Sequence, residues 1–403
     1  MQVTIARLGH QGDGIAEGPV FVPRALPGEV VAGDLIRDRI ESPRIVMPSV
    51  LRVKPPCAHY RSCGGCALQH ARPDFVAEWK EGVIRQALAG QGIEAVFRPA
   101  HISGLGTRRR AGFSGRRLKK GALVGFHARG SDVITAVPDC LILHPDLIAC
   151  LPLLEDLTAR FGSRKTELGL SLTRSEAGLD LALTGGKPLD GAMRIELGQW
   201  AGQSGLARLA WEGEVIAQAR PPLHRIGPAQ VVPPPGAFLQ ATKDAEAALQ
   251  AAVAEAVGEA GRIVDLFAGC GTFALPLAQA AEVHAVEGDG AMLKALDQGW
   301  RGAQGVRRVS HEIRDLFRNP LLPEELDRFN AAVIDPPRAG AEAQSAALAA
   351  SGIARIAAVS CNPVTFARDA KMLIAGGFRL DWVQMVDQFR FSPHVELAAQ
   401  FTR

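Results

Sequence analysis

The sequence has little cysteine, few aromatic residues and almost no net charge for its length. Its 403 residues include seven cysteines, 5% aromatic residues and 22% charged residues, against 47% hydrophobic residues. This composition excludes a disordered chain, a collagen-like chain and a small disulfide-stapled protein. At roughly 100–200 residues per domain, the length predicts two to four globular domains.

The sequence also lacks the signals of export and membrane insertion. Its first residues, Met1 to Arg7, show no basic segment followed by an apolar core, which a secretory signal would need. No charge-free apolar run reaches the roughly 18 residues that a membrane helix requires. We therefore expect a cytoplasmic protein without a membrane partner, acting as a monomer.

The net charge of +3 conceals an uneven distribution. Residues 1–235 contain 29 lysines and arginines against 22 acidic residues, whereas residues 236–403 contain 16 against 20. No acidic residue lies between Glu94 and Asp132. A basic window of one sign favours contact with a nucleic-acid backbone, although a solvated basic face is the alternative. The candidate RNA-binding residues are Arg108, Arg109, Arg110, Arg116, Arg117, Lys119 and Lys120.

The first two-thirds of the chain divides into two predicted domains. Residues 1–54 contain short β-forming stretches separated by glycine and proline, which indicate a small closed barrel. Residues 55–235 show mixed signals, and the proline run at 232–236 marks a domain boundary. We predict strands at 3–8, 18–22, 29–36, 45–53, 108–114, 122–127 and 179–183, and a helix at 75–89.

Residues 236–403 form the third predicted domain, in which strands alternate with helices. Such alternation indicates a doubly wound α/β sheet that binds its ligand at the carboxyl ends of the strands. We predict helices at 243–259 and 272–281, strands at 262–267, 282–287, 330–335 and 353–360, and a terminal antiparallel pair at 382–388 and 395–401.

Three of the seven cysteines lie within ten residues, and an odd count without a secretory signal argues against disulfides. Cys57, Cys63 and Cys66 are joined by a loop containing Gly64 and Gly65, and Cys140 is the best candidate for a fourth ligand. Four thiolates can hold a tetrahedral zinc ion or an iron–sulfur cluster, and the spacing leaves both open. Unrelated buried cysteines are the alternative reading.

A glycine-rich turn follows the predicted strand at 262–267. The segment from Asp265 to Phe273 opens a helix, whose free backbone amides can bind a ligand. Glu287 ends the next strand, where a carboxylate typically binds the ribose of an adenosine ligand. The turn lacks the full dinucleotide fingerprint, so it favours S-adenosylmethionine over a nicotinamide cofactor.

Two further motifs end the next two predicted strands, beside the proposed ligand. These are Asp335-Pro-Pro-Arg338 and Cys361-Asn-Pro363. A cysteine at a strand end before a proline turn is well placed as an exposed nucleophile, although a lone cysteine there would by default be buried in the sheet. Near the C-terminus, His394-Val-Glu396 begins the last strand.

Together these motifs resemble those of the RNA uracil-C5 methyltransferase family, in the same order along the chain. They comprise Gln240, the Asp265–Phe273 turn, Glu287, Asp335-Pro-Pro-Arg-Ala-Gly340, Val359-Ser-Cys361-Asn-Pro363 and His394-Val-Glu396. The segment from Gly14 to Glu29 resembles a TRAM domain, an OB-like RNA-binding barrel. With the cysteine cluster, the chain most resembles the iron–sulfur members that methylate 23S ribosomal RNA.

The resemblance implies a mechanism and a set of roles. Cys361 would add to C6 of uracil, C5 would take the methyl group of S-adenosylmethionine, and Glu396 would remove the C5 proton, giving 5-methyluridine. The C-terminal domain would be a Rossmann-like class I methyltransferase, and Cys57, Cys63, Cys66 and Cys140 would hold a [4Fe-4S] cluster. The residues expected around the cofactor and base are Gln240, Phe267, Thr272, Glu287, Asp315 and Asp335.

The chain departs from the family pattern at three positions. Arg390 and Ser392 stand where the family usually has proline and threonine, and Thr272 stands where asparagine is common. Transfer RNA is the alternative substrate, although family members that methylate it generally lack the cysteine cluster. A non-catalytic RNA-binding or ribosome-assembly factor and a redox iron–sulfur protein are the alternatives of another class.

Overall fold

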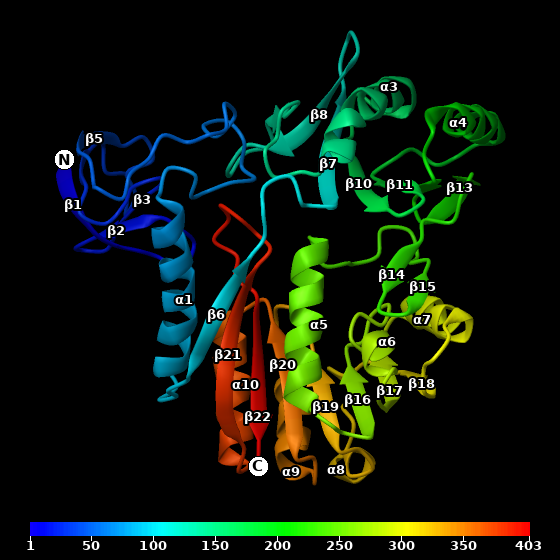
Figure 1. The fold of residues 1–403 in the computed structure, drawn as a ribbon. Helices are drawn as coiled ribbons and strands as arrows, with labels where there is room; N and C mark the ends of the chain where they lie inside the picture. Colours follow the sequence, from blue (N-terminus) through cyan, green and yellow to red (C-terminus); the bar gives the residue numbers. More distant parts are fainter.

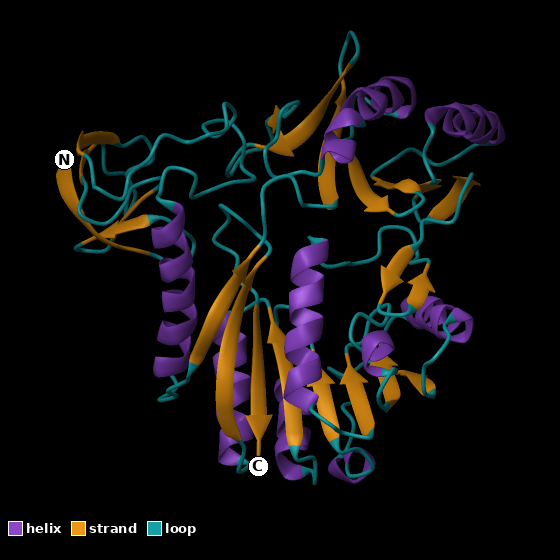
Figure 2. Cartoon of the chain, in the orientation of Figure 1, coloured by secondary structure: helices purple, strands orange, loops and turns teal.

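The computed structural model describes residues 1–403 and contains three main sheets. Two smaller sheets lie at one end of a large sheet that is flanked by helices (Figure 1). Helices cover both faces of the large sheet, as the purple segments of Figure 2 show. No helix of the chain is both long and apolar enough to cross a bilayer.

The N-terminal sheet is antiparallel and has five strands in the order β3-β2-β1-β4-β5. Its edge strands β3 and β5 do not pair with each other, although Phe21 of β3 hydrogen-bonds to the backbone of residues 38–40. The strands form no closed barrel, so that prediction is not confirmed. Three of its strands are only three residues long. The strands are β1 (Gln2–Leu8), β2 (Gly14–Ala16), β3 (Val20–Val22), β4 (Val30–Ala32) and β5 (Arg44–Met47).

The central sheet has seven strands in the order β13-β12-β11-β10-β7-β8-β9. Its helices α3 and α4 pack on it and bury leucine and tryptophan side chains. A separate hairpin, β14–β15, packs against α7. The bounds are β7 (Arg110–Arg117), β8 (Ala122–His127), β9 (Ile134–Thr135), α2 (Pro145–Ala149), α3 (Leu151–Phe161), β10 (Leu168–Ser175), β11 (Gly178–Thr184), α4 (Gly191–Ser204), β12 (Arg208–Trp211), β13 (Glu214–Gln218), β14 (His224–Ile226) and β15 (Ala229–Val231).

The large sheet has eight strands in the order β18-β17-β16-β19-β20-β22-β21-β6. Strands β18 to β20 are parallel, β22 runs antiparallel to both of its neighbours, and β6 is parallel to β21. The predicted α/β class and the terminal antiparallel pair are therefore confirmed. The strands are β6 (Phe97–Ile102), β16 (Arg262–Leu266), β17 (Glu282–Glu287), β18 (Val309–Ile313), β19 (Ala331–Ile334), β20 (Arg355–Ser360), β21 (Arg379–Asp387) and β22 (Leu397–Thr402).

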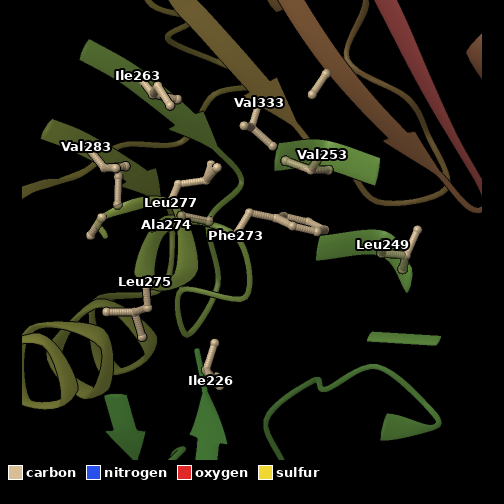
Figure 3. Close-up of a cluster of buried hydrophobic side chains, with 14 of the residues drawn as sticks. Ile226, Leu249, Val253, Ile263, Phe273, Ala274, Leu275, Leu277, Val283 and Val333 are labelled. Carbon is tan, nitrogen blue, oxygen red and sulfur yellow. The ribbon is translucent and has the colours of Figure 1, made fainter. Parts of the chain in front are cut away.

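Two hydrophobic cores cover the two faces of this sheet. One face packs against α5, α6 and α7, where Leu249, Val253 and Phe273 belong to one buried cluster with the strand residues Ile263 and Val333 (Figure 3). The other face packs against α1, α9 and α10. The helices are α1 (Pro73–Ala89), α5 (Lys243–Val257), α6 (Ala274–Leu277), α7 (Gly290–Gly302), α8 (Pro323–Leu326), α9 (Glu342–Ala350) and α10 (Pro363–Ala375).

The large sheet is not built from the C-terminal region alone. Strand β6 supplies its edge, and α1 packs against α10. The buried ammonium of Lys80 on α1 donates to Asp387 at the end of β21 over 2.7 Å and also to the carbonyl of Phe389. Residues 73–102 and 236–403 therefore form one structural unit.

Candidate active site

A single cavity of about 1620 Å³ lies where the parallel strands end. Strands β16, β17, β19 and β20 all point their carboxyl ends toward the two smaller sheets (Figure 1). The cavity is lined by every residue predicted as catalytic, as cofactor-binding or as a cysteine ligand: Cys361, Glu396, Gln240, Phe267, Thr272, Glu287, Asp315, Asp335, Cys57, Cys63, Cys66 and Cys140.

The glycine-rich turn after β16 wraps around the Glu287 carboxylate. The amide of Gly269 donates to Oε2 of Glu287 over 3.0 Å, and Gly269 has a φ of +55°, which favours glycine. A side chain at Gly271, with a φ of +90°, would meet Leu275 at 2.9 Å. The turn is thus held close to the carboxylate at the end of β17, as an adenosine site requires.

An aromatic pair covers the same end of the cavity. The rings of Phe267 and Phe317 lie 5.4 Å apart, and both residues line the cavity. Asp315 accepts a hydrogen bond from the amide of Phe317 over 3.0 Å, so it holds the turn that carries this ring. Phe317 was not predicted as a site residue, because an exposed phenylalanine in a loop has no motif to mark it.

Cys361 directly follows β20 and precedes α10. Asn362 caps α10 by accepting from the amide of Val364, and its own amide donates to the carbonyl of Arg338 over 2.8 Å. This bond ties the cysteine turn to the Asp335–Arg338 turn. Burial raises the pKa of the Cys361 thiol to about 11, and the nearby Glu396 and Asp335 carboxylates contribute, while Arg338 acts in the opposite direction.

Glu396 and Asp335 are two carboxyl groups that share this pocket with the thiol. Glu396 is only 4% exposed, and burial, followed by repulsion from Asp335, raises its pKa to about 8. Burial also raises the pKa of Asp335 to about 7. A cation bound in the cavity would lower all three pKa values, because their cause is burial among negative groups. The pocket is therefore suited to a positively charged ligand beside a nucleophile and a base.

The loop before Glu396 is held from several sides. The carbonyl of Phe391 accepts from the amides of Ala67 and Leu68, over 2.8 and 3.0 Å, so the loop after Cys66 contacts it directly. A guanidinium nitrogen of Arg338 lies 3.2 Å from Nδ1 of His394. Ser392, one of the departures from the family pattern, accepts from the amide of His394, and Arg390 lines the cavity.

The four predicted cysteine ligands come from two loops that are tied together. His59 pairs with Asp139 over 2.5 Å, and the amide of Gly64 donates to the carbonyl of His127 over 2.9 Å. A side chain at Gly64 would approach that carbonyl to 2.6 Å, so only glycine fits there. Burial, with the neighbouring thiols, raises the pKa of Cys66 to about 12.

No three metal-binding side chains lie close enough to bind one metal ion. The predicted metal site is therefore not confirmed as a coordination geometry. All four thiols are free, and all four residues line the cavity.

The predicted RNA-binding residues are distributed over different environments. Arg109 is buried at 7% exposure, and it pairs with buried Glu246 over 2.5 Å, so it is not a surface contact. Burial lowers the pKa of half-buried Arg108 and of Arg110. Arg116 pairs with Glu167, and Arg117 donates to the carbonyl of Gly162. Only Lys119 and Lys120, in the turn between β7 and β8, are fully exposed.

Comparison with known proteins gives three related results. The profile of the tRNA (uracil-5-)-methyltransferase family matches residues 306–403. An uncharacterized RNA methyltransferase of Brucella suis is 43% identical over 405 residues, covering 100% of this chain and 98% of the relative. The 23S rRNA (uracil(1939)-C(5))-methyltransferase RlmD of Halomonas elongata is 31% identical over 431 residues, covering 98% of this chain and 88% of the relative.

One solved structure shares the fold along the whole chain. It is the Pyrococcus abyssi tRNA (uracil-54, C5)-methyltransferase in complex with S-adenosyl-L-homocysteine, with a TM-score of 0.79. The alignment covers 100% of this chain and 99% of that one, at 23% identity. At this identity the match establishes a common architecture.

Proposed function

The chain belongs to the RNA uracil-C5 methyltransferase family, and from this premise we propose that it converts a uridine of 23S ribosomal RNA into 5-methyluridine. The observation that carries the proposal is the shared cavity in which Cys361, Asp335 and Glu396 interact electrostatically. A nucleophile and a base that act on adjacent ring atoms have to face one pocket.

Cys361 and Glu396 divide the chemistry between them. The Cys361 thiolate adds to C6 of uracil, and the electrons of the C5–C6 double bond form an enolate that makes C5 nucleophilic. After C5 has gained the methyl group, the Glu396 carboxylate takes the C5 proton, and the C6–sulfur bond breaks to release the thiolate. The target base has to leave its stack to reach this buried pair, at a cost of a few kcal/mol.

S-adenosylmethionine supplies the methyl group as an electrophilic sulfonium when bound. Glu287 and the Gly269 turn would hold the ribose of this cofactor. The rings of Phe267 and Phe317 would pack against the apolar parts of the cofactor, and Asp335 would face its sulfonium group. Thr272 and Asp315 line the same part of the cavity. Because the carboxylates raise the pKa of Cys361, this cation would help to ionise the thiol.

We assign the four cysteines to a [4Fe-4S] cluster. Each thiolate of such a cluster binds a different iron, so its ligands are spread further apart than around one zinc ion. Loops tied by His59–Asp139 and by Gly64 suit such a ligand set. The cluster would brace the loop after Cys66, whose amides bind the carbonyl of Phe391. Anaerobic purification should give a brown protein with absorbance near ~400 nm, and a colourless protein with one zinc would refute the assignment.

The RNA backbone would lie along the exposed basic residues. Lys119 and Lys120 lie free at the tip of the β7–β8 hairpin, and Arg116 and Arg117 are half-buried on the same strands. Arg108 lies at the cavity, 5.7 Å above the ring of Phe389, and Arg110 lies over Phe238. Positive side chains on this strand and its hairpin would attract the phosphates of a polyanion.

Tritium release from RNA containing 5-³H-uridine tests the proposal. The wild-type protein should release tritium with adenosylmethionine, and Cys361→Ala should abolish release. Cys150→Ala, at a buried core cysteine that does not line the cavity, should preserve it. Parallel assays on purified 23S rRNA and transfer RNA decide the substrate. Release from transfer RNA alone would refute the rRNA assignment, and release from neither RNA would refute the activity.

A further inference from the structure

Gln388 lies behind the wall of the cavity and connects two of its lining residues. It follows β21, is 2% exposed and does not itself line the cavity. Its side chain donates to Oε1 of Gln240 over 2.6 Å and to Oε2 of Glu396 over 3.0 Å. It also accepts from the backbone amide of Ala241 over 2.6 Å. No motif of the sequence marks this residue.

These three bonds determine which way both glutamine amides face. A backbone N–H can only donate, so the Gln388 atom that faces Ala241 has to be the oxygen. The Gln388 NH₂ group therefore faces Gln240 and Glu396. An NH₂ group can only donate, so Gln240 has to present its oxygen to Gln388.

The orientation of Gln240 leaves its own NH₂ group free at the cavity. Gln240 lines the cavity, and its Nε2 atom makes no hydrogen bond to the protein. A donor in such a place selects a ligand that carries an acceptor opposite it, because an unmatched buried polar group is costly.

We propose that Gln388 is a specificity-determining positioning residue that makes Gln240 select the O4 oxygen of uracil against the amino group of cytosine. The inference rests on the proposed function. In uracil, C4 with its oxygen is bonded directly to C5, which Glu396 deprotonates. Gln240 and Glu396 hydrogen-bond to the same NH₂ group of Gln388, so they are neighbours on the cavity wall. A base placed with C5 at Glu396 thus brings the group on C4 toward Gln240.

Two substitutions of Gln388 distinguish a role in orienting the Gln240 amide from a role in packing. Gln388→Met keeps the approximate shape and removes every hydrogen bond, so Gln240 is free to turn either face to the cavity. Gln388→Glu keeps an acceptor for Ala241 but replaces the NH₂ group with an oxygen. Gln240 then has to donate to that oxygen, and it turns its own oxygen toward the base, where it matches the cytosine amino group.

The measurement is the ratio of dissociation constants for two RNA oligonucleotides. They carry the sequence that the tritium assay identifies and differ only in uridine or cytidine at the target position. Binding is measured with enzyme saturated in S-adenosylhomocysteine, so that no turnover occurs. The wild-type protein should favour uridine by about tenfold or more, the value of one matched hydrogen bond in a buried site.

The ratio of the dissociation constant for the cytidine RNA to that for the uridine RNA should fall toward one in Gln388→Met. The same ratio should be lower still in Gln388→Glu. The added charge of Gln388→Glu also attracts the amino group of cytosine, so the uncharged Gln388→Met is the variant that decides the role of Gln388. Gln384→Met removes a glutamine from β21, the strand that precedes Gln388. The Gln384 amide donates to the carbonyl of Pro99, and this variant should keep the wild-type ratio. A far-ultraviolet circular dichroism spectrum that matches the wild-type spectrum shows that each variant is folded.

The outcomes distinguish this inference from the function on which it rests. A wild-type ratio retained in both Gln388 variants overturns the role of Gln388 and leaves the methyltransferase activity standing. An equal loss of affinity for both RNAs indicates a purely structural residue and also overturns it. A wild-type protein that methylates no RNA overturns the proposed function and this inference together.

Discussion

Replacing Glu396 with glutamine should stabilise the protein at alkaline pH and leave its stability nearly unchanged at acid pH. Glu396 is 4% exposed, and its pKa in the folded protein rises from 4.5 to about 8 because burial and Asp335 disfavour its charge. Between these two values the folded state holds a proton that the unfolded state has lost. The stability is therefore greatest below pH 4.5 and falls as the pH rises through about 8.

The loss of stability caused by Glu396 follows from the difference between its pKa values in the unfolded and folded states. Each pH unit between the two pKa values costs about 1.4 kcal/mol of unfolding free energy. Part of the rise in pKa comes from Asp335, so we expect a cost of about 2–5 kcal/mol for Glu396 at pH 9. Glutamine carries no charge, and its carbonyl can still accept the bond that Gln388 donates to Glu396.

Thermal unfolding of the two proteins from pH 5 to pH 9 measures this difference. For a chain of this length, a change of 1 kcal/mol in unfolding free energy shifts the melting temperature by about 1 °C. Glu396→Gln should therefore melt about 2–5 °C above the wild-type protein at pH 9, and within about 1 °C of it at pH 5. Glu259→Gln, a change at an exposed residue after α5, is the matched control. A difference that does not vary with pH would show that Glu396 does not titrate as a buried carboxyl, and the reasoning on its role as base would fail.

Three further predictions concern the buried pair, the basic hairpin and the cysteine loop. Arg109→Met should destabilise the protein by about 1.5–3 kcal/mol, because buried Glu246 loses its buried partner and keeps only the bond from the exposed Lys243; a loss of RNA affinity at unchanged melting temperature would contradict this. Replacing Lys119 and Lys120 with alanine should weaken binding of all RNA sequences alike and reduce the slope of log affinity against log salt by about 2; a sequence-selective effect would argue against backbone contact. Gly64→Ala should reduce the iron content after anaerobic purification, since its side chain would approach a carbonyl to 2.6 Å; full iron content, measured by plasma emission, would refute the role of this close approach.

Much of the candidate site could be predicted because it lies on consecutive strand ends. The hydrophobic runs before Phe267, Glu287, Asp335 and Cys361 predict buried strands, and the carboxyl ends of parallel strands meet at one edge. Local sequence patterns were therefore enough to predict that these residues lie close together, because the prediction needed no information on long-range contacts. Their roles as nucleophile, base and cofactor ligands remain proposals.

Other features could not be predicted, because they depend on partners that are distant in sequence. Arg109 belongs to a basic run, yet it pairs with a glutamate that the sequence separates from it by 137 residues. Gln388 receives its role from Gln240, 148 residues away, and from the amide of Ala241. Nothing in the neighbourhood of either residue signals its partner.

The sequence by itself determined the α/β class, the order of the motifs and the residues that gather around one cavity, because hydrophobic periodicity and strand ends are local properties. Only the tertiary structure decided that the N-terminal strands form no closed barrel, that β6 joins the edge of the C-terminal sheet while α1 covers one of its faces, and that Gln388 orients Gln240. Sheet closure, edge pairing and amide orientation depend on contacts such as Lys80 with Asp387, which lie 307 residues apart, and such contacts exist only in the folded chain.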